Sequence, residues 1–141
     1  MRAAMLEIMP IIKEGWVVGG KILIVDDQYG IRILLHEVLS LDGYETLMAE
    51  DGKEALRLFE QHQPDLIILD MKMPGLNGLD ILRAIRKRSS DVQVFMMTAY
   101  GELDMIKEAT RLGVTQYFTK PFDIEQLRQS VREWFHKSIH A

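Results

Sequence analysis

The sequence predicts one α/β domain whose core is a single parallel sheet of five strands, with helices on both faces. Two observations lead to this fold class. Between residues 21 and 137, short apolar runs alternate five times with segments of helical periodicity, which is the order that successive β-α units produce. Three of the apolar runs contain almost no polar residues, as in parallel strands that are covered on both sides.

The first two β-α units occupy residues 21–62. The run KILIV ends in two aspartates and is predicted as the first strand. A helix is predicted over residues 29–41, where five apolar residues recur at the spacing of one helix face: Ile31, Leu34, Leu35, Val38 and Leu39. A turn at 42–43 leads to a strand over 44–50, and Asp51 is placed to cap a helix that ends near residue 62.

The other three units follow directly. Residues 65–70 are predicted as a buried strand, 79–88 as a helix and 92–99 as the fourth strand. A helix over 102–112 ends at Gly113, residues 114–120 form the fifth strand, and Asp123 caps a last helix that reaches about residue 137. The α/β domain is therefore assigned to residues 21–141.

Residues 1–20 do not continue this pattern and are assigned to an N-terminal extension. The segment is mostly apolar, but Glu7, Pro10 and Glu14 interrupt it, which is unlike a secretory signal peptide. Three interpretations stay open: an additional helix, a disordered tail, and a translated leader ahead of a GTG start codon at residue 17 or 18. The last is considered because Lys-Glu-Gly-Trp can be encoded by bases that resemble a bacterial ribosome-binding site.

Composition limits the classes of function. The chain has 141 residues, of which 48% are hydrophobic and 27% charged, as in an ordinary globular domain. Its net charge of −4 argues against a nucleic-acid partner, which favours a basic surface. It contains no cysteine, so a disulfide framework and thiolate metal sites are excluded. No apolar run approaches the ~20 residues that span a membrane, and a cytoplasmic location is expected.

Polar groups with related chemistry follow four of the predicted strands: Asp26 and Asp27, Asp70, Thr98, and Lys120. The carboxyl ends of parallel strands meet at one edge of the sheet, where such folds bind their ligands. Taken alone, an aspartate after a strand is usually a turn or cap residue, and a lysine before a proline is usually at the surface. Four such groups at one edge favour a functional site.

The chemistry of these groups indicates phosphoryl transfer. Clustered carboxylates repel one another, and a hard divalent cation such as Mg²⁺ relieves this repulsion. A threonine hydroxyl and a lysine ammonium suit phosphoryl oxygens, and a carboxylate can be the nucleophile that forms an aspartyl phosphate. Asp70 ends an apolar strand at this edge, and it is the expected nucleophile.

Four motifs give the chain a resemblance to a known family: ILIVDD, LIILDMKMPG, MTAYG and FTKPFD. Together they resemble the receiver domain of bacterial two-component response regulators, from Lys21 to about Lys137, and within that family the response regulators of sporulation phosphorelays. The resemblance implies a flavodoxin-like sheet with strand order 2-1-3-4-5. It also implies a phosphoprotein that labels itself on aspartate with Mg²⁺, rather than an enzyme with small-molecule turnover.

The resemblance assigns a metal site and a phosphorylation site. Asp70 matches the phosphoacceptor. Mg²⁺ or Mn²⁺ is expected at Asp26, Asp27 and Asp70 and at the backbone carbonyl of Lys72, with Asp27 a direct ligand and Asp26 acting through water. The side chain of Lys72, together with Tyr100, is expected to slow hydrolysis of the acyl phosphate.

The resemblance also assigns the residues around the phosphoryl group. Thr98, the N–H of Ala99 and Lys120 match the phosphate-binding groups, and the peptide between Lys120 and Pro121 matches a cis bond. Tyr117 falls at the switch aromatic of the wider family, and it departs from the sporulation regulators, which have histidine there.

The partners follow from the same resemblance. A sensor histidine kinase is expected to phosphorylate the protein, and a histidine phosphotransferase with a helical bundle is expected to receive the phosphoryl group. An aspartyl-phosphate phosphatase is a further expected partner. The expected docking surface consists of Gln28, Tyr29, Gly30, Ile31, Leu34, Pro121 and Phe122. For Ile31 and Leu34, the competing interpretation is packing in the core.

Three other functions are compatible with parts of the pattern. A stand-alone receiver that binds a protein target when phosphorylated, with Tyr117 as its switch, is the main alternative. A phosphatase of the dehalogenase type would place its nucleophile in a D-x-D motif after the first strand, where this chain has adjacent aspartates. A flavin-binding module would need a phosphate-binding loop there, and the segment DDQYGI is acidic instead.

Overall fold

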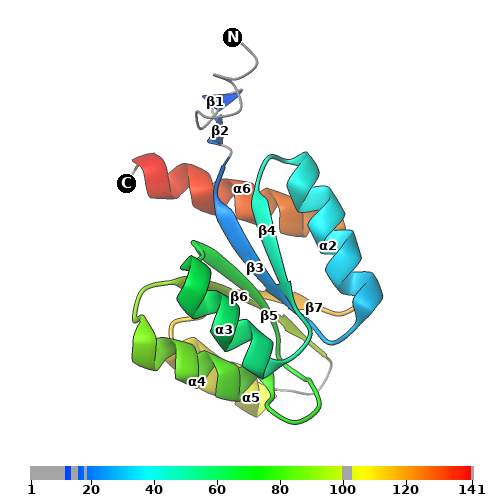
Figure 1. Cartoon of the computed structure of the whole chain (residues 1–141), viewed down its shortest axis with the longest axis vertical. Helices are drawn as coiled ribbons and strands as arrows, with labels where there is room; N and C mark the ends of the chain where they lie inside the picture. Colours follow the sequence, from blue (N-terminus) through cyan, green and yellow to red (C-terminus); the bar gives the residue numbers. More distant parts are fainter. Residues whose placement is uncertain (1–11, 14–15, 18, 100–102, 141) are drawn as a thin grey trace.

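The protein forms one five-stranded sheet covered by helices (Figure 1). The computed structural model describes residues 12–13, 16–17, 19–99 and 103–140. The strands of the sheet are β3 (Lys21–Val25), β4 (Glu45–Ala49), β5 (Leu66–Asp70), β6 (Gln93–Thr98) and β7 (Gln116–Thr119). The described helices are α2 (Tyr29–Leu41), α3 (Gly52–His62), α4 (Gly78–Arg88), α5 (Leu103–Arg111) and α6 (Ile124–His140).

The topology confirms the predicted fold class. The strands lie side by side in the order β4-β3-β5-β6-β7, and every neighbouring pair is parallel. When the five strands of this sheet are numbered by their order in the chain, this is the predicted strand order 2-1-3-4-5. Because Val25 pairs with Leu69 and Asp70 pairs with Met97, the strands end at nearly the same level. The residues that follow them therefore share one edge.

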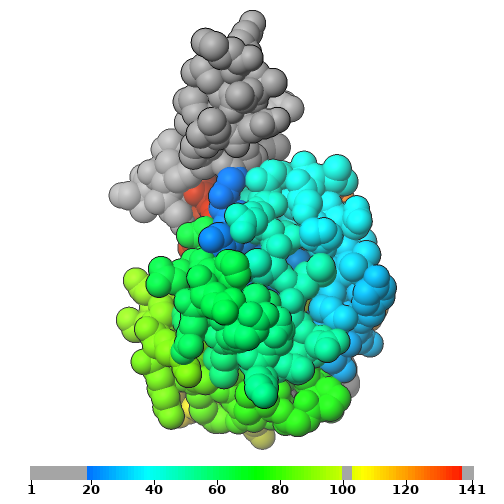
Figure 2. Space-filling view, viewed as in Figure 1, coloured from blue at the N-terminus to red at the C-terminus, as the bar shows by residue number. Residues whose placement is uncertain are grey.

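Helices cover both faces of the sheet, which explains why its strands are so apolar. In Figure 1, α2 and α6 lie on one face and α3, α4 and α5 on the other. Alternate residues of β3 enter the two cores: Leu23 and Val25 pack with α3, α4 and α5, whereas Ile22 and Ile24 pack with α2 and α6. Residues 22–25 of β3 are fully buried, and little of this strand is visible on the face shown in Figure 2. A strand buried on both faces has no position for a polar residue until it ends.

Local signals place the helix ends where the sequence predicts them. The Asp51 carboxylate accepts a hydrogen bond of 2.8 Å from the N–H of Glu54 at the start of α3. The Asp123 carboxylate accepts one of 2.9 Å from the N–H of Glu125 at the start of α6. Gly113, after α5, has a φ of +93°, which glycine adopts without strain. Capping residues therefore act here as they do in isolated helices.

One core prediction for α2 is wrong. Leu35 and Leu39 are fully buried, and Ile31 and Val38 pack partly against the same core. Leu34, predicted as part of this stripe, is 44% exposed. Successive residues of a helix differ by about 100°, so Leu34 lies at the margin of a stripe centred on Leu35 and Leu39, where the sheet does not cover it.

The N-terminal extension is described only in part. Ile12–Lys13 (β1) and Trp16–Val17 (β2) pair as short antiparallel strands, so these four residues are not helical. β2 lies beside α6. Residues 1–11, 14–15 and 18 lie outside the described residues, and the choice between a true extension and a translated leader stays a prediction. Within the described residues, no helix is both long and apolar enough to cross a membrane.

Candidate functional site

The end of β3 provides two carboxylates in different surroundings. Asp26 is fully buried, and its N–H donates a hydrogen bond of 3.2 Å to the carbonyl of Ala49 in β4. Its carboxylate accepts a hydrogen bond of 2.8 Å from the N–H of Gln28. Asp27, the next residue, is exposed. The pair therefore offers one buried carboxylate held by the backbone and one carboxylate open to solvent.

Asp70 is the last residue of β5 and is only 4% exposed. One carboxylate oxygen accepts a hydrogen bond of 3.3 Å from the N–H of Lys72. The start of α4 lies directly against this strand end, because a Cβ at Gly78 would come within 2.3 Å of the Asp70 carbonyl oxygen. The Gly78 N–H donates a hydrogen bond of 2.9 Å to the carbonyl of Met71. Glycine at this position lets the helix approach the strand closely.

Lys120 joins the two strand ends. Its Nζ lies 2.7 Å from a carboxylate oxygen of Asp26 and 3.2 Å from one of Asp70, and it donates to the side-chain oxygen of Gln28 at 3.2 Å. Its backbone N–H donates a hydrogen bond of 2.8 Å to the carbonyl of Thr98. The peptide bond to Pro121 is cis, as the resemblance implies. The ammonium is therefore fixed between both carboxylates at the carboxyl edge of the sheet.

The charges of the site oppose one another. Burial and the nearby charge of Asp26 raise the pKa of Asp70 from 3.8 to about 6, although Lys120 and the N–H of Lys72 act in the opposite direction. Burial alone would lower the pKa of Lys120, but its contacts with Asp26 and Asp70 outweigh that effect and raise this pKa. Folding thus holds the Asp70 carboxylate where its ionised form is disfavoured and a cation would stabilise it.

The acidic residues fit a divalent cation. Asp26, Asp27 and Asp70 each offer a carboxylate oxygen, and these atoms lie within 4.8 Å of one another. Three oxygen ligands at this spacing, one of them exposed, match Mg²⁺ or Mn²⁺, which keep several waters in their coordination shells. The structure brings together the three carboxylates that the sequence predicts. The role of the Lys72 carbonyl stays a prediction.

Thr98 and Ala99 lie next to this cluster in the sheet. Met97 pairs with Asp70, and Thr98 is the following residue of β6, with an exposed fraction of 3%. Ala99 comes after it and is exposed. Both residues therefore reach the same edge as Asp70. Their contacts with a phosphoryl group stay predictions, and Tyr100 lies outside the described residues.

Tyr117 is directed at a helix rather than at the carboxylates. Its hydroxyl lies 2.6 Å from the Thr110 hydroxyl and donates to the carbonyl of Ile106 at 3.2 Å, both of which belong to α5. The ring is half-buried. A change in the position of this side chain would therefore change the contacts of α5.

The predicted docking residues lie at the start of α2 and directly after Lys120, and they differ in exposure. Tyr29 is 69% exposed and Leu34 is 44% exposed, and a Cβ at Gly30 would meet nothing within 4 Å. Ile31 and Phe122 are half-buried and pack against the core. Gln28 and Pro121 are exposed. For Leu34, the docking interpretation therefore agrees with its exposure better than core packing does, whereas Ile31 serves the core at least in part.

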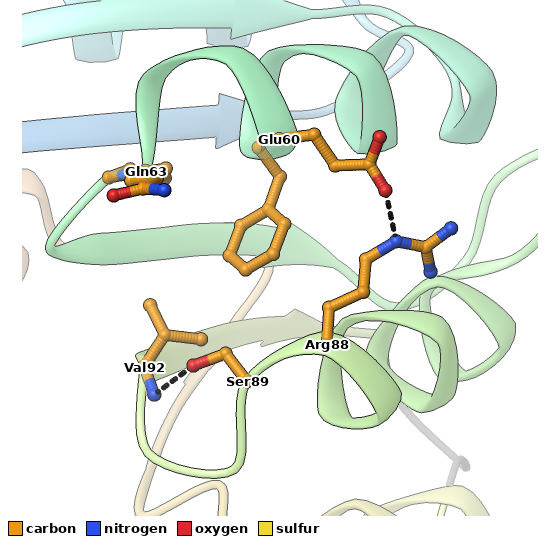
Figure 3. Close-up of a pocket in the computed structure, with 7 residues that line it drawn as sticks. Glu60, Gln63, Arg88, Ser89 and Val92 are labelled. Carbon is orange, nitrogen blue, oxygen red and sulfur yellow. Dashed lines mark hydrogen bonds and ion pairs between the residues drawn. The ribbon is translucent and has the colours of Figure 1, made fainter.

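A hollow of about 480 Å³ lies at the other end of the sheet (Figure 3). Its lining includes Gln63 and Pro64, which precede β5, and Ser89 and Val92, which precede β6. The exposed ion pair between Glu60 and Arg88 spans it. Because Asp70 and Thr98 lie at the opposite ends of these strands, the hollow is separate from the carboxylate site.

Sequence reasoning missed one residue beside the site. The Arg32 guanidinium in α2 donates a hydrogen bond of 2.7 Å to the carbonyl of Asp26 and lies 5.7 Å from the centre of the Tyr29 ring. A signal was present, because an arginine three residues after Tyr29 lies on the same side of a helix. Its contact with Asp26 depends on how α2 leaves the strand, which periodicity does not describe.

Comparison with known proteins gives the family. Residues 22–132 match the response regulator receiver domain. The chain is 51% identical over 114 residues to sporulation initiation phosphotransferase F of Bacillus subtilis, and the match covers 81% of this chain and 92% of that protein. Regulatory protein AtoC of Escherichia coli and a probable transcriptional regulator of Guillardia theta also match, at 38% and 44% identity, but the match covers only 24% and 44% of their lengths.

Solved structures agree with this assignment. A response regulator receiver domain protein from Clostridium thermocellum superposes with a TM-score of 0.78 at 35% identity, over 84% of this chain and 96% of that one. Chemotaxis protein CheY4 of Vibrio cholerae superposes with a TM-score of 0.77 at 31% identity, over 82% of this chain and 98% of that one. The chain belongs to the receiver domain family of two-component response regulators.

Proposed function

We propose that the protein is a phosphoryl carrier: Asp70 accepts a phosphoryl group from a sensor histidine kinase and passes it to a histidine phosphotransferase in a sporulation-type phosphorelay. The observation that carries the proposal is the position of Asp70, which lies within 4.8 Å of two further carboxylates and 3.2 Å from the Lys120 ammonium. The likeness to sporulation initiation phosphotransferase F over 92% of that protein's length supports the relay role.

Acceptance of the phosphoryl group needs an ionised and positioned nucleophile. A carboxylate oxygen of Asp70 attacks phosphorus as the P–N bond of the partner's phosphohistidine breaks, and the imidazole leaves with the bonding electrons. The product is a mixed anhydride between carboxylate and phosphate. Transfer of the phosphoryl group to the histidine phosphotransferase is the reverse reaction. A histidine nitrogen of that second partner attacks phosphorus, and the Asp70 carboxylate leaves.

The surrounding groups stabilise the negative charge on the phosphoryl oxygens. Lys120 provides a fixed ammonium for them. The Thr98 hydroxyl and the Ala99 N–H are the proposed hydrogen-bond donors. Asp26, Asp27, Asp70 and the Lys72 carbonyl would hold Mg²⁺, which when bound neutralises the carboxylates and stabilises the charge of the transferring phosphoryl group.

The surface around Tyr29 and Leu34 is the proposed docking site for both histidine proteins. A large aromatic ring and an aliphatic side chain, both exposed on α2, suit the apolar face of a partner helix. Gln28, whose side-chain oxygen accepts a hydrogen bond from Lys120, and Pro121, which follows Lys120, are exposed as well. A partner seated there would present its histidine to Asp70 and would cover the site during transfer. An aspartyl-phosphate phosphatase is proposed to use the same surface.

A second candidate function is an end-point signal. In that case phosphorylation would change the binding of a protein target at α5, β7 and α6, with Tyr117 as the switch. The hydrogen bonds of the Tyr117 hydroxyl to Thr110 and Ile106 favour it, because they connect the aromatic side chain to α5. Similarity to a chemotaxis protein of one domain's length is compatible with this role.

One labelling experiment separates the two functions. The purified protein is incubated with Mg²⁺ and a ³²P-labelled histidine kinase, and a candidate histidine phosphotransferase is then added. A carrier is expected to gain the label on Asp70 and then lose it to the second protein. Retention of the label on Asp70, with phosphorylation-dependent binding of another protein, would support the end-point signal. Equal labelling of an Asp70→Asn variant would contradict both.

A further inference from the structure

One arginine at the start of α2 contacts the backbone of the acid pair. Nη1 of Arg32 donates a hydrogen bond of 2.7 Å to the carbonyl oxygen of Asp26. The same guanidinium lies 5.7 Å from the centre of the Tyr29 ring and 3.9 Å from a carboxylate oxygen of Glu50. The Arg32 side chain is only 12% exposed. The guanidinium is therefore held on several sides, in contrast to an ordinary surface arginine.

The contact falls on the peptide that joins Asp26 to Asp27. Asp26 lies one residue beyond β3, so its carbonyl is outside the ladder of that strand. Its N–H is fixed by the carbonyl of Ala49 at 3.2 Å, and its carbonyl is fixed by Arg32. Rotation of this peptide would turn the Asp27 carboxylate, since the exposed side chain of Asp27 follows directly. The hydrogen bond from Arg32 therefore restrains the peptide on which the direction of the Asp27 carboxylate depends.

The planar guanidinium suits this task. It can donate to the Asp26 carbonyl, lie near the Glu50 carboxylate and approach an aromatic ring at the same time, because its N–H groups form a rigid fork. A lysine ammonium could replace the hydrogen bond to the carbonyl but would lack the planar contacts. The buried position also strengthens the hydrogen bond, since water competes for it poorly.

We propose that Arg32 is a positioning residue, which orients the Asp26–Asp27 peptide so that the acid pair binds the divalent cation. The proposal rests on the proposed function, which places the cation at Asp26, Asp27 and Asp70. Simple electrostatics makes the opposite prediction. Loss of a positive charge near the carboxylates should make cation binding tighter, whereas loss of the positioning contact should make it weaker.

The test is direct Mn²⁺ binding to the full chain, measured from the electron paramagnetic resonance signal of free Mn²⁺. For Arg32→Met, which removes the charge and keeps an unbranched chain, we expect the Mn²⁺ dissociation constant to rise about tenfold, as for the loss of groups that orient metal ligands. Arg32→Lys should lie between this variant and the wild type. An unchanged or lower dissociation constant for Arg32→Met would overturn the proposal.

Labelling by acetyl phosphate provides a second readout. In Arg32→Met, the Mg²⁺ concentration for half-maximal labelling of Asp70 should rise about tenfold, and the rate at saturating Mg²⁺ should stay within twofold of the wild type. A low rate at saturating Mg²⁺ would contradict a role through the cation site. If Arg32→Met does not fold, Arg32→Gln, which also removes the charge and is too short to reproduce the contacts of the guanidinium, takes its place, and an unchanged or lower Mn²⁺ dissociation constant for that variant would overturn the proposal.

The matched control is Arg57→Met. Arg57 lies on α3 and pairs with Glu54 and Gln61, so this variant makes the same change of charge away from the acid pair. Its Mn²⁺ dissociation constant should stay within twofold of the wild type, and a tenfold rise would overturn the assignment to Arg32. Failure of the cation site that the proposed function requires has a different result, since the wild-type protein itself would then bind no Mn²⁺.

Discussion

Replacement of Asp70 by asparagine should stabilise the protein at neutral pH, in the absence of divalent cations. Burial and the neighbouring charge of Asp26 raise the pKa of Asp70 from 3.8 to about 6, so the folded state disfavours the ionised carboxylate. Asparagine has the shape of the protonated acid and carries no charge. Lys120 keeps a partner after the substitution, because its Nζ also lies 2.7 Å from Asp26.

The magnitude follows from linkage between protonation and folding. A pKa that is higher in the folded state means that stability from Asp70 is fully present below pH 3.8 and is lost as the pH rises through about 6. At about 1.4 kcal/mol per pH unit, the ionised carboxylate costs the folded state up to about 3 kcal/mol at pH 7. This cost already includes the attraction between the carboxylate and Lys120, which lowers the pKa of Asp70. Because an amide does not reproduce every contact of the protonated acid, we expect a gain of about 1–3 kcal/mol.

Urea unfolding in EDTA, followed by circular dichroism at pH 7 and at pH 4, measures this gain. The asparagine variant should be more stable than the wild type at pH 7, and the difference should almost vanish at pH 4. Glu37→Gln, on the exposed surface of α2, makes the same change in net charge and should have little effect at either pH. Equal stability of wild type and Asp70→Asn at pH 7, or the same gain at both pH values, would refute the reasoning.

Four further substitutions test other parts of the site and fold. Gly78→Ala should cost about 1–3 kcal/mol of stability and should slow labelling by acetyl phosphate, because the new Cβ would lie 2.3 Å from the Asp70 carbonyl oxygen. Leu34→Ala should reduce transfer from the histidine kinase at least fivefold while labelling by acetyl phosphate is kept, since this leucine is 44% exposed on α2, the helix that follows the acid pair. Lys72→Gly should shorten the lifetime of the aspartyl phosphate, because it removes an exposed side chain next to Asp70, and loss of ³²P with time measures this. Arg128→Ala should lower the free energy of unfolding in urea by about 1–2 kcal/mol, because its guanidinium makes a bidentate pair of 2.6 and 2.9 Å with the turn after α2.

Each of these substitutions has a control and an opposing outcome. Gly30→Ala places a Cβ in open space and should not destabilise the fold; a Gly78→Ala variant that behaves the same way would contradict the close approach. Ile31→Ala should cost stability as well as transfer, since Ile31 packs on the core. If Leu34→Ala reduces labelling by the histidine kinase and labelling by acetyl phosphate to the same extent, the docking role of Leu34 is contradicted. If the aspartyl phosphate of Lys72→Gly decays at the wild-type rate, the Lys72 side chain does not slow its hydrolysis. Arg128→Lys should recover only part of the free energy of unfolding that Arg128→Ala loses, and full recovery would contradict the role of the bidentate contact.

Much of the fold could be predicted because its signals are local. The strands were recognisable as short apolar runs, and the helix starts depended on caps such as Asp51 and Asp123, whose bonds span two or three residues. Parallel order then followed from the alternation of strands and helices. The candidate residues of the site were recognisable because a strand buried on both faces can turn polar only where it ends.

Contacts between distant segments could not be predicted in the same way. Lys120 and Asp26 are separated by 94 positions. The ion pair between them depends on the sheet order, in which β5 and β6 lie between β3 and β7 and the carboxyl ends of these parallel strands share one edge. The exposure of Leu34 depends on how α2 is rotated over the sheet, and periodicity leaves the margins of an apolar stripe undefined. The contact of Arg32 with Asp26 could not be predicted for a related reason: its acceptor is a backbone carbonyl, which carries no signal in the sequence.

Residue chemistry along the chain was therefore enough to determine the α/β class, the parallel sheet and which side chains could take part in phosphoryl transfer, and the family resemblance added the strand order. Only the folded structure decided how they are charged and oriented: the raised pKa of Asp70, the ammonium of Lys120 between two carboxylates, and the guanidinium of Arg32 on the Asp26 carbonyl. The physical reason is that hydrophobic periodicity and caps act over a few residues, whereas desolvation and charge depend on every segment that packs around a group.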